Sequence, residues 1–291
     1  MADRYRDAEA CLNRAIARLV DAPENVPPGT TGSSLLVLCY VLKAMVYASI
    51  GEYDDSERCS RRASDLSREN ARPYDIIAAD YSRGFVHMSY GKLEEAENAL
   101  SEASFLSREN EAWVFLPYVL CALGNVYLQT GRATEAKDIL LEAKDKAEAL
   151  GHGTSVLLAS TYLASAYAQL GNPTRGLELA RACQAGAKQK GYQTIEALAL
   201  FAEAVILSFQ GASAVSDAIA RLERMIEIAT RLGIRPLLGR AKGILARLLA
   251  ASGRKSDAQG ELAQAIELFA KSKMTLQLER AKATLSKFSE L

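Results

Sequence analysis

Side chains that could do chemistry are few and scattered along this chain. There are two histidines, His87 and His152, and His152 lies between two glycines in an expected turn. No group of His, Cys, Asp and Glu has the spacing of a metal site, and neither a glycine-rich phosphate loop nor a nucleophile elbow is present. The sequence therefore predicts no enzyme activity, no metal and no cofactor.

The cysteines and the paired acids favour structural roles. The five cysteines are odd in number, far apart and never in a Cys-x-x-Cys pair: Cys11, Cys39, Cys59, Cys121 and Cys183. They are typical of reduced, small apolar residues in the core of a cytoplasmic protein. Acidic pairs such as Asp54-Asp55 and Glu94-Glu95 lie where helices are expected to begin, and carboxylates there interact favourably with the helix dipole.

The composition excludes several classes of partner. Hydrophobic residues make up 49% of the 291 positions, and 35 basic residues balance 35 acidic ones. The absence of a basic surplus argues against direct nucleic-acid binding. The first residues lack the apolar stretch of a secretory signal, and the longest apolar run, from Leu35 to Ile50, is interrupted by Lys43 and too short to span a membrane. We expect a cytoplasmic protein without a membrane partner.

An internal repeat organises most of the sequence. Six glycines mark it, separated by steps of 40, 40, 40, 40 and 42 residues: Gly51, Gly91, Gly131, Gly171, Gly211 and Gly253. The residue seven positions before each glycine is always small: Ala44, Gly84, Gly124, Ala164, Ala204 and Ala246. The residue four positions before is large: Tyr47, His87, Tyr127, Tyr167, Leu207 and Leu249. His87 thus occupies a packing position that tyrosine fills elsewhere.

Each repeat reads as a helical hairpin. Apolar residues on both sides of each glycine recur every three or four positions, which is one face of an α-helix. The glycine ends the first helix, and small residues on both helices allow their axes to approach closely. Gly151, Gly191 and Gly233 fall at the turns between successive hairpins. No segment has the alternation of a strand, so the fold class predicted is all-α.

The third repeat resembles the tetratricopeptide repeat (TPR). Leu123-Gly124 and Tyr127 stand in its first helix, followed by Ala136, Leu140 and Ala143 in its second. The resemblance implies an α-solenoid of stacked antiparallel hairpins wound into a right-handed superhelix. The 40-residue period exceeds the usual one and resembles the regulatory helical regions of bacterial MalT-like activators and ATPase-cyclase signalling proteins.

We expect a single solenoid over residues 1–291. Residues 4–20 form a half-repeat helix, 21–34 a Pro- and Gly-rich linker, 35–270 the six hairpins and 275–288 a capping helix. The opening helix is either a native cap or the remnant of a hairpin cut from a longer protein, and the second explanation is slightly favoured.

A partner is expected on the concave face, which the first helices line. In the resembling family, the residues ten, six and three positions before the glycine point into that groove. From these positions and the neighbouring glutamines we predict a binding set: Val41, Met45, Tyr81, Phe85, Met88, Cys121, Asn125, Gln129, Thr161, Ser165, Gln169, Phe201, Val205 and Arg247. The set is nearly uncharged, which disfavours a highly charged ligand.

Two functions fit this groove. The first is a non-enzymatic scaffold that binds a peptide or a partner domain, as the regulatory part of a bacterial signalling protein. The alternative is a small-molecule sensor that controls an attached ATPase, cyclase or transcription-activator domain. Only Asn125 and Arg247 match the Lys-Asn-Asn-Lys-Arg set with which some relatives hold a terminal carboxylate. The competing structural interpretation is that Tyr81 and Phe85 pack between repeats. The sequence does not indicate the oligomeric state.

Overall fold

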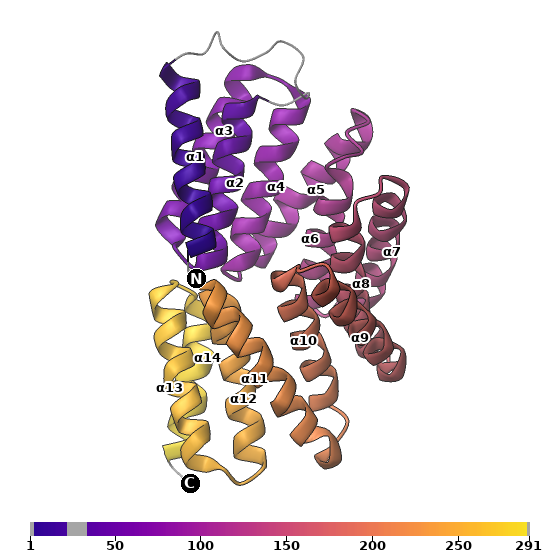
Figure 1. Ribbon diagram of the computed structural model, residues 1–291, viewed down its shortest axis with the longest axis vertical. Coiled ribbons are helices and arrows are strands. Elements are labelled where there is room, and N and C mark those ends of the chain that lie inside the picture. The colour runs from indigo at the N-terminus through magenta and orange to yellow at the C-terminus, as the bar shows by residue number, and fades with distance from the viewer. Residues whose placement is uncertain (1–2, 22–33, 290–291) are drawn as a thin grey trace.

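The computed structural model describes residues 3–21 and 34–289, and within them the chain forms α-helices without strands (Figure 1). The helices are α1 (Asp3–Asp21), α2 (Leu35–Ile50), α3 (Tyr53–Asn70), α4 (Pro73–Ser89), α5 (Leu93–Glu109), α6 (Leu116–Gln129), α7 (Ala133–Ala149), α8 (Gly153–Gln169), α9 (Pro173–Gln189), α10 (Gln193–Ser208), α11 (Val215–Leu232), α12 (Arg235–Ala251), α13 (Lys255–Lys271) and α14 (Thr275–Ser289). A short 3-10 helix, Ala212–Ala214, takes up the two extra residues of the fifth repeat. No helix in these ranges is both long enough and apolar enough to cross a lipid bilayer.

The helices pair as the repeat predicts. Helices α2 to α13 form six consecutive antiparallel hairpins. Five are joined by a tight turn at a repeat glycine, and α10 and α11 by residues 209–214, which include Gly211 and the 3-10 helix. The six repeat glycines all have positive φ, between 79° and 91°, a backbone region that glycine adopts at low cost. Gly211, with ψ of −175°, is extended and precedes the short 3-10 helix. The predicted all-α solenoid of helical hairpins is therefore confirmed.

Close approach of the paired helices explains the small residue before each glycine. A Cβ atom added to Gly124 of α6 would lie 2.5 Å from Cγ of Leu140 on α7. A Cβ at Gly84 would meet Leu100 of α5 in the same way, at 2.4 Å. Leucine from the second helix thus fills the space that the missing side chain leaves, and the two axes come together.

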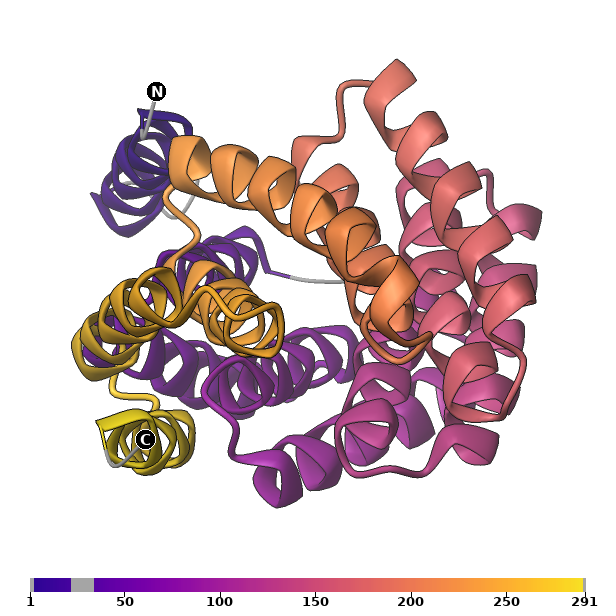
Figure 2. The same cartoon turned by 90° about the horizontal axis from the view of Figure 1, so that it is seen from below.

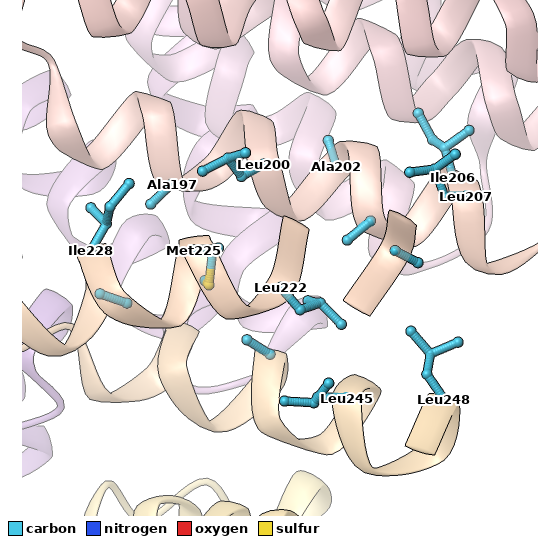
Figure 3. Close-up of a cluster of buried hydrophobic side chains, with 14 of the residues drawn as sticks. Ala197, Leu200, Ala202, Ile206, Leu207, Leu222, Met225, Ile228, Leu245 and Leu248 are labelled. Carbon is cyan, nitrogen blue, oxygen red and sulfur yellow. The ribbon is translucent and has the colours of Figure 1, made fainter. Parts of the chain in front are cut away.

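The core is a series of clusters between neighbouring helices rather than one centre, as expected of a solenoid. The largest lies between α10, α11 and α12, where Leu200, Leu222, Met225 and Leu245 meet (Figure 3). Tyr5 of α1 also packs against this cluster, so the first helix contacts a part of the chain more than 200 positions away.

The two ends of the solenoid meet. The chain winds round until α12, α13 and α14 lie beneath the first hairpins (Figures 1 and 2). One buried cluster joins Tyr47 of α2 and Val86 of α4 to Leu262 and Phe269 of α13 and to Met274. The repeat pattern does not predict this closure, because it specifies only contacts between neighbouring hairpins.

The terminal helices lie close to their expected bounds. Helix α1 covers the predicted half-repeat, and the Tyr47 hydroxyl donates a hydrogen bond to Oε1 of Glu9 at 2.6 Å. Most of the predicted linker, residues 22–33, lies outside the described residues. Helix α14 occupies the place of the predicted cap, and its Leu278 and Leu285 pack against the closing cluster.

Candidate functional site

The first helices of successive hairpins, α2, α4, α6, α8, α10 and α12, contact one another in turn. In a solenoid of stacked hairpins this row of helices forms the inner wall of the superhelix. In each one, side chains spaced by three or four residues share one face. The predicted groove residues come from these six helices. The structure separates them into side chains that remain accessible and side chains that the packing covers.

An aromatic series runs along the inner wall from α4 to the turn before α8. The Tyr81 ring lies 6.5 Å from that of Phe85 and 6.4 Å from that of Tyr118, and Tyr118 lies 5.9 Å from the His152 ring. Tyr81 and Phe85 are partly exposed while they pack against the cluster between α4, α5 and α6. They therefore contribute both to packing and to the accessible surface.

Amide side chains continue this surface. Asn125 Nδ2 lies 3.4 Å from Sδ of Met88, and Gln129 Nε2 donates to Oδ1 of Asn125 at 3.4 Å. Asn125 also interacts with the hydroxyl of Tyr162 on α8. Gln169 Nε2 donates to the Leu128 carbonyl at 3.3 Å and so connects α8 to α6. Amides of this kind offer both a donor and an acceptor, as a peptide backbone does.

Four residues of the predicted set are buried. Val41, Met88, Cys121 and Thr161 are 4%, 6%, 1% and 1% exposed. The Thr161 hydroxyl donates to the Leu157 carbonyl of its own helix at 2.8 Å, and burial raises the pKa of the Cys121 thiol to about 12. These four side chains pack beneath the inner surface and offer little contact area to a ligand.

The remaining predicted residues are partly or fully exposed. Met45 packs partly against the first hairpins, and Phe201 partly against the cluster of α10 to α12. Ser165 and Val205 are partly exposed, and Gln129, Gln169 and Arg247 are exposed. A binding role for the set as a whole stays a prediction.

Three further inner residues, Tyr118, Tyr162 and Arg240, lie outside the predicted set. Tyr118 and Arg240 stand thirteen positions before the repeat glycine, one turn earlier than the first predicted position. Extending the same three- and four-residue spacing by one turn would have found both. Tyr162 lies one position after the predicted Thr161. Because Arg240 is a cation, the inner wall is not as uncharged as the predicted set implies.

Arg240 crosses the interior from α12. Its Nη2 points to the carbonyl oxygen of Ser89 at the end of α4, 3.5 Å away. Its charge also interacts with Tyr162 of α8. Burial lowers the pKa of the guanidinium, and Tyr162 partly counteracts that shift. A side chain from the sixth hairpin therefore meets the second and fourth, which only the winding of the superhelix brings together.

Two hollows lie away from this surface, beside α1. One of about 550 Å³ is bordered by Arg6, Glu9, Tyr47 and Arg235. The other, about 400 Å³ and mainly apolar, lies between α1, α2 and the beginnings of α8 and α10. Tyr5 and Leu232 line both, and neither contains a residue of the predicted groove.

This geometry defines the class as a TPR-like α-solenoid with a concave, mainly aromatic and amide inner wall. Residues 117–145, in the third hairpin, match the family model of the tetratricopeptide repeat. The sequence matches no curated protein.

Solved structures share this helical-repeat fold over most of the chain. NprR in complex with its cognate peptide NprX has a TM-score of 0.75 at 10% identity, over 97% of this chain and 80% of that one. A Rap protein complexed with competence and sporulation factor has a TM-score of 0.63 at 14% identity, over 94% and 80%. A signal-transduction ATPase (STAND) protein with a tetratricopeptide repeat sensor from Pyrococcus horikoshii has a TM-score of 0.52 at 16% identity, over 98% and 43%. The chain is thus a TPR-like helical repeat protein.

Proposed function

We propose that this chain is a non-enzymatic interaction scaffold that binds a peptide against the inner wall of its superhelix. One observation carries the proposal: Tyr81, Phe85, Asn125 and Tyr162 are partly exposed on adjoining inner helices. Aromatic rings supply large contact area at low cost in conformational entropy, and amides can hydrogen-bond an extended backbone. Two solved neighbours are complexes: NprR with its cognate peptide NprX, and a Rap protein with competence and sporulation factor.

The regulatory context is part of the same proposal. A scaffold of this kind transmits binding to an attached or associated output domain when the ligand prefers one conformation of the superhelix. Such a change in conformation would alter the contacts between the first and last hairpins. The resemblance of the repeats to bacterial signalling proteins and the likeness to the STAND sensor support a signalling role.

Affinity selection tests the peptide proposal directly. Short soluble synthetic peptides of random sequence are incubated with the protein, and retained peptides are identified by mass spectrometry and measured by calorimetry. We expect Tyr81→Ala combined with Phe85→Ala to weaken the retained peptides about 10-fold or more, since each ring loses stacking and apolar contact. Phe105→Ala is the matched control, because Phe105 is an exposed ring (58%) on α5, outside the inner wall.

Folding must be followed in the same variants. Tyr81 and Phe85 also pack against the core, so circular dichroism melting distinguishes lost binding from lost structure. Retention of no peptide by the folded wild-type protein would contradict the proposal. If the folded Tyr81→Ala, Phe85→Ala variant binds the peptides as tightly as wild type, the peptide site does not include these two rings.

The alternative function, a small-molecule sensor, is favoured by one feature. The 400 Å³ apolar hollow bordered by Tyr5, Val46 and Tyr192 is within the usual size of ligand pockets. A thermal-shift screen against metabolites tests it. A ligand whose effect disappears in Val46→Trp, which fills the hollow, would support the sensor.

A further inference from the structure

Arg240 is a cation held inside the superhelix without an acidic partner among the described residues. Its guanidinium makes one long hydrogen bond, to the Ser89 carbonyl at 3.5 Å, and its other electrostatic neighbour is the Tyr162 hydroxyl. Arg235, earlier on the same helix, instead pairs with Glu52 at 2.5 Å. Removing a charge from water costs stability unless a partner compensates it, so the isolation of Arg240 needs an explanation.

Arg240 is largely buried, but part of its surface remains accessible to solvent. Tyr81, Tyr162 and Arg240 all keep part of their surface accessible. Burial is nevertheless the largest cause of the pKa shift of each: it raises the pKa of both phenols and lowers that of the guanidinium. Neighbouring atoms therefore cover most of each side chain, while part of its surface stays accessible. A ligand there would meet a poorly hydrated cation.

The available donors suit a carboxylate. A guanidinium presents five N–H groups in a planar fork, and the Ser89 carbonyl uses one of them. The remaining groups can bind both oxygens of a carboxylate side by side. The Tyr162 hydroxyl next to the guanidinium and the amide of Asn125 next to Tyr162 can add further hydrogen bonds.

We propose that Arg240 is the anchor for a carboxylate of the bound peptide, assisted by Tyr162 and Asn125. This inference rests on the proposed peptide-binding function and specifies its ligand. The carboxylate belongs either to the C-terminus of the peptide or to an aspartate or glutamate side chain. Both have the same chemistry, and the aromatic series of Tyr81, Phe85 and Tyr118 then receives the apolar remainder of the peptide.

The test compares two synthetic peptide libraries, one with free and one with amidated C-termini, on the wild-type protein, Arg240→Gln and Arg240→Lys. We expect wild-type binders to depend on a free C-terminus or to be enriched in Asp and Glu. Arg240→Gln should weaken them about 10- to 100-fold, as expected when a charged hydrogen-bonded pair is lost. Arg240→Lys should restore only part of the affinity, because an ammonium cannot form the planar fork.

The outcomes separate this inference from the function on which it rests. Loss of affinity only in the amidated library assigns the carboxylate to the C-terminus, and acidic enrichment in both libraries assigns it to a side chain. Peptides that bind wild type and Arg240→Gln equally well overturn the anchor but leave the scaffold intact. If the folded wild-type protein retains no peptide, both proposals fail.

A measurement of melting temperature distinguishes a ligand-binding role of Arg240 from a purely structural one. An unpaired interior cation is unfavourable for folding, so Arg240→Met should melt at the same temperature as wild type or higher. The matched control is Arg224→Gln on the outer face of α11, where Arg224 pairs with Glu227, and it should leave peptide binding unchanged. A marked fall in the melting temperature of Arg240→Met would show that the cation is structural, against the proposal.

Discussion

Arg235, the first residue of α12, pairs with Glu52, in the turn after α2, although 183 positions separate them in the sequence. Arg235 also donates to the Ile50 carbonyl, so it holds the turn of the first hairpin against the beginning of the last. Lys273 pairs with Asp54 at 2.7 Å in the same region, and Ser272 lies against Gly51. These polar contacts lie beside the buried cluster that closes the superhelix, which contains the neighbouring residue Met274.

Arg235→Gln should loosen this closure without unfolding the chain. Glu52 is nearly half exposed, so we expect the lost ion pair to reduce the free energy of unfolding by about 1 kcal/mol or less. The main effect should be faster hydrogen–deuterium exchange in the turn after α2, measured by mass spectrometry. Arg224→Gln is the charge-matched control. Equal exchange in the two variants would show that Arg235 does not hold the ends together.

The apolar part of the closure should matter more. Phe269 is 5% exposed and lies against Gly239, where an added Cβ would come 2.7 Å from its ring. Phe269→Ala should lower the free energy of unfolding by about 3–5 kcal/mol, because it leaves a cavity in the cluster shared by both ends. Urea denaturation followed by circular dichroism measures this. Phe105→Ala removes an exposed ring and should cost well under 1 kcal/mol; a similar cost for the two would contradict the burial of Phe269.

Gly124 and Gly131 should respond to alanine for different reasons. At Gly124 the new methyl would overlap Leu140, and such overpacking typically costs about 1–3 kcal/mol. At Gly131 there is open space, but φ is 79°, so the cost of about 1 kcal/mol comes from backbone strain.

A double-mutant cycle distinguishes the two effects. Leu140→Ala should be less destabilising in the Gly124→Ala background than in wild type, since the truncated side chain makes room for the methyl. It should be additive with Gly131→Ala. Equal coupling in both cycles, measured by urea denaturation, would mean that contact with Leu140 is not what requires glycine at position 124.

His87 should make stability depend on pH. Burial lowers its pKa below the ordinary 6.5, and its Nδ1 is buried without a hydrogen-bond partner among the described residues. The unfolded chain then binds more protons than the folded one below about pH 6.5, so the stabilising contribution of neutral His87 is complete above that pH and is lost as the pH falls through the folded value. Thermal melting from pH 7.5 to 5.5 should show this decline.

Two substitutions test the assignment to His87. His87→Tyr installs the residue that Tyr47, Tyr127 and Tyr167 provide at the same repeat position, and His87→Gln removes the titration with a polar side chain. Both should flatten the pH dependence relative to wild type. The contribution of Asp80, whose pKa burial raises, has the opposite sign and cancels in the comparison. A decline of the same slope in both variants would assign the effect to another group.

The sequence by itself determined the hairpins. The spacing of Gly84, Gly124 and Gly131 specifies where helices end and where their axes touch, because these requirements act over one or two turns of helix and recur in every repeat. The inner face is also defined by residue spacing within a single helix, so Tyr81, Phe85 and Asn125 could be assigned to it from the sequence. Extending the same spacing by one helical turn adds Tyr118.

Only the tertiary structure decided what meets across the superhelix. The small rotation from each hairpin to the next adds up over six repeats, and that sum brings Arg235 to Glu52 and Arg240 to Ser89 and Tyr162. The total rotation over six repeats cannot be derived from the residue pattern of one repeat, because it depends on how every pair of neighbouring helices packs. The closed ends and the isolated interior cation are therefore properties of the complete winding.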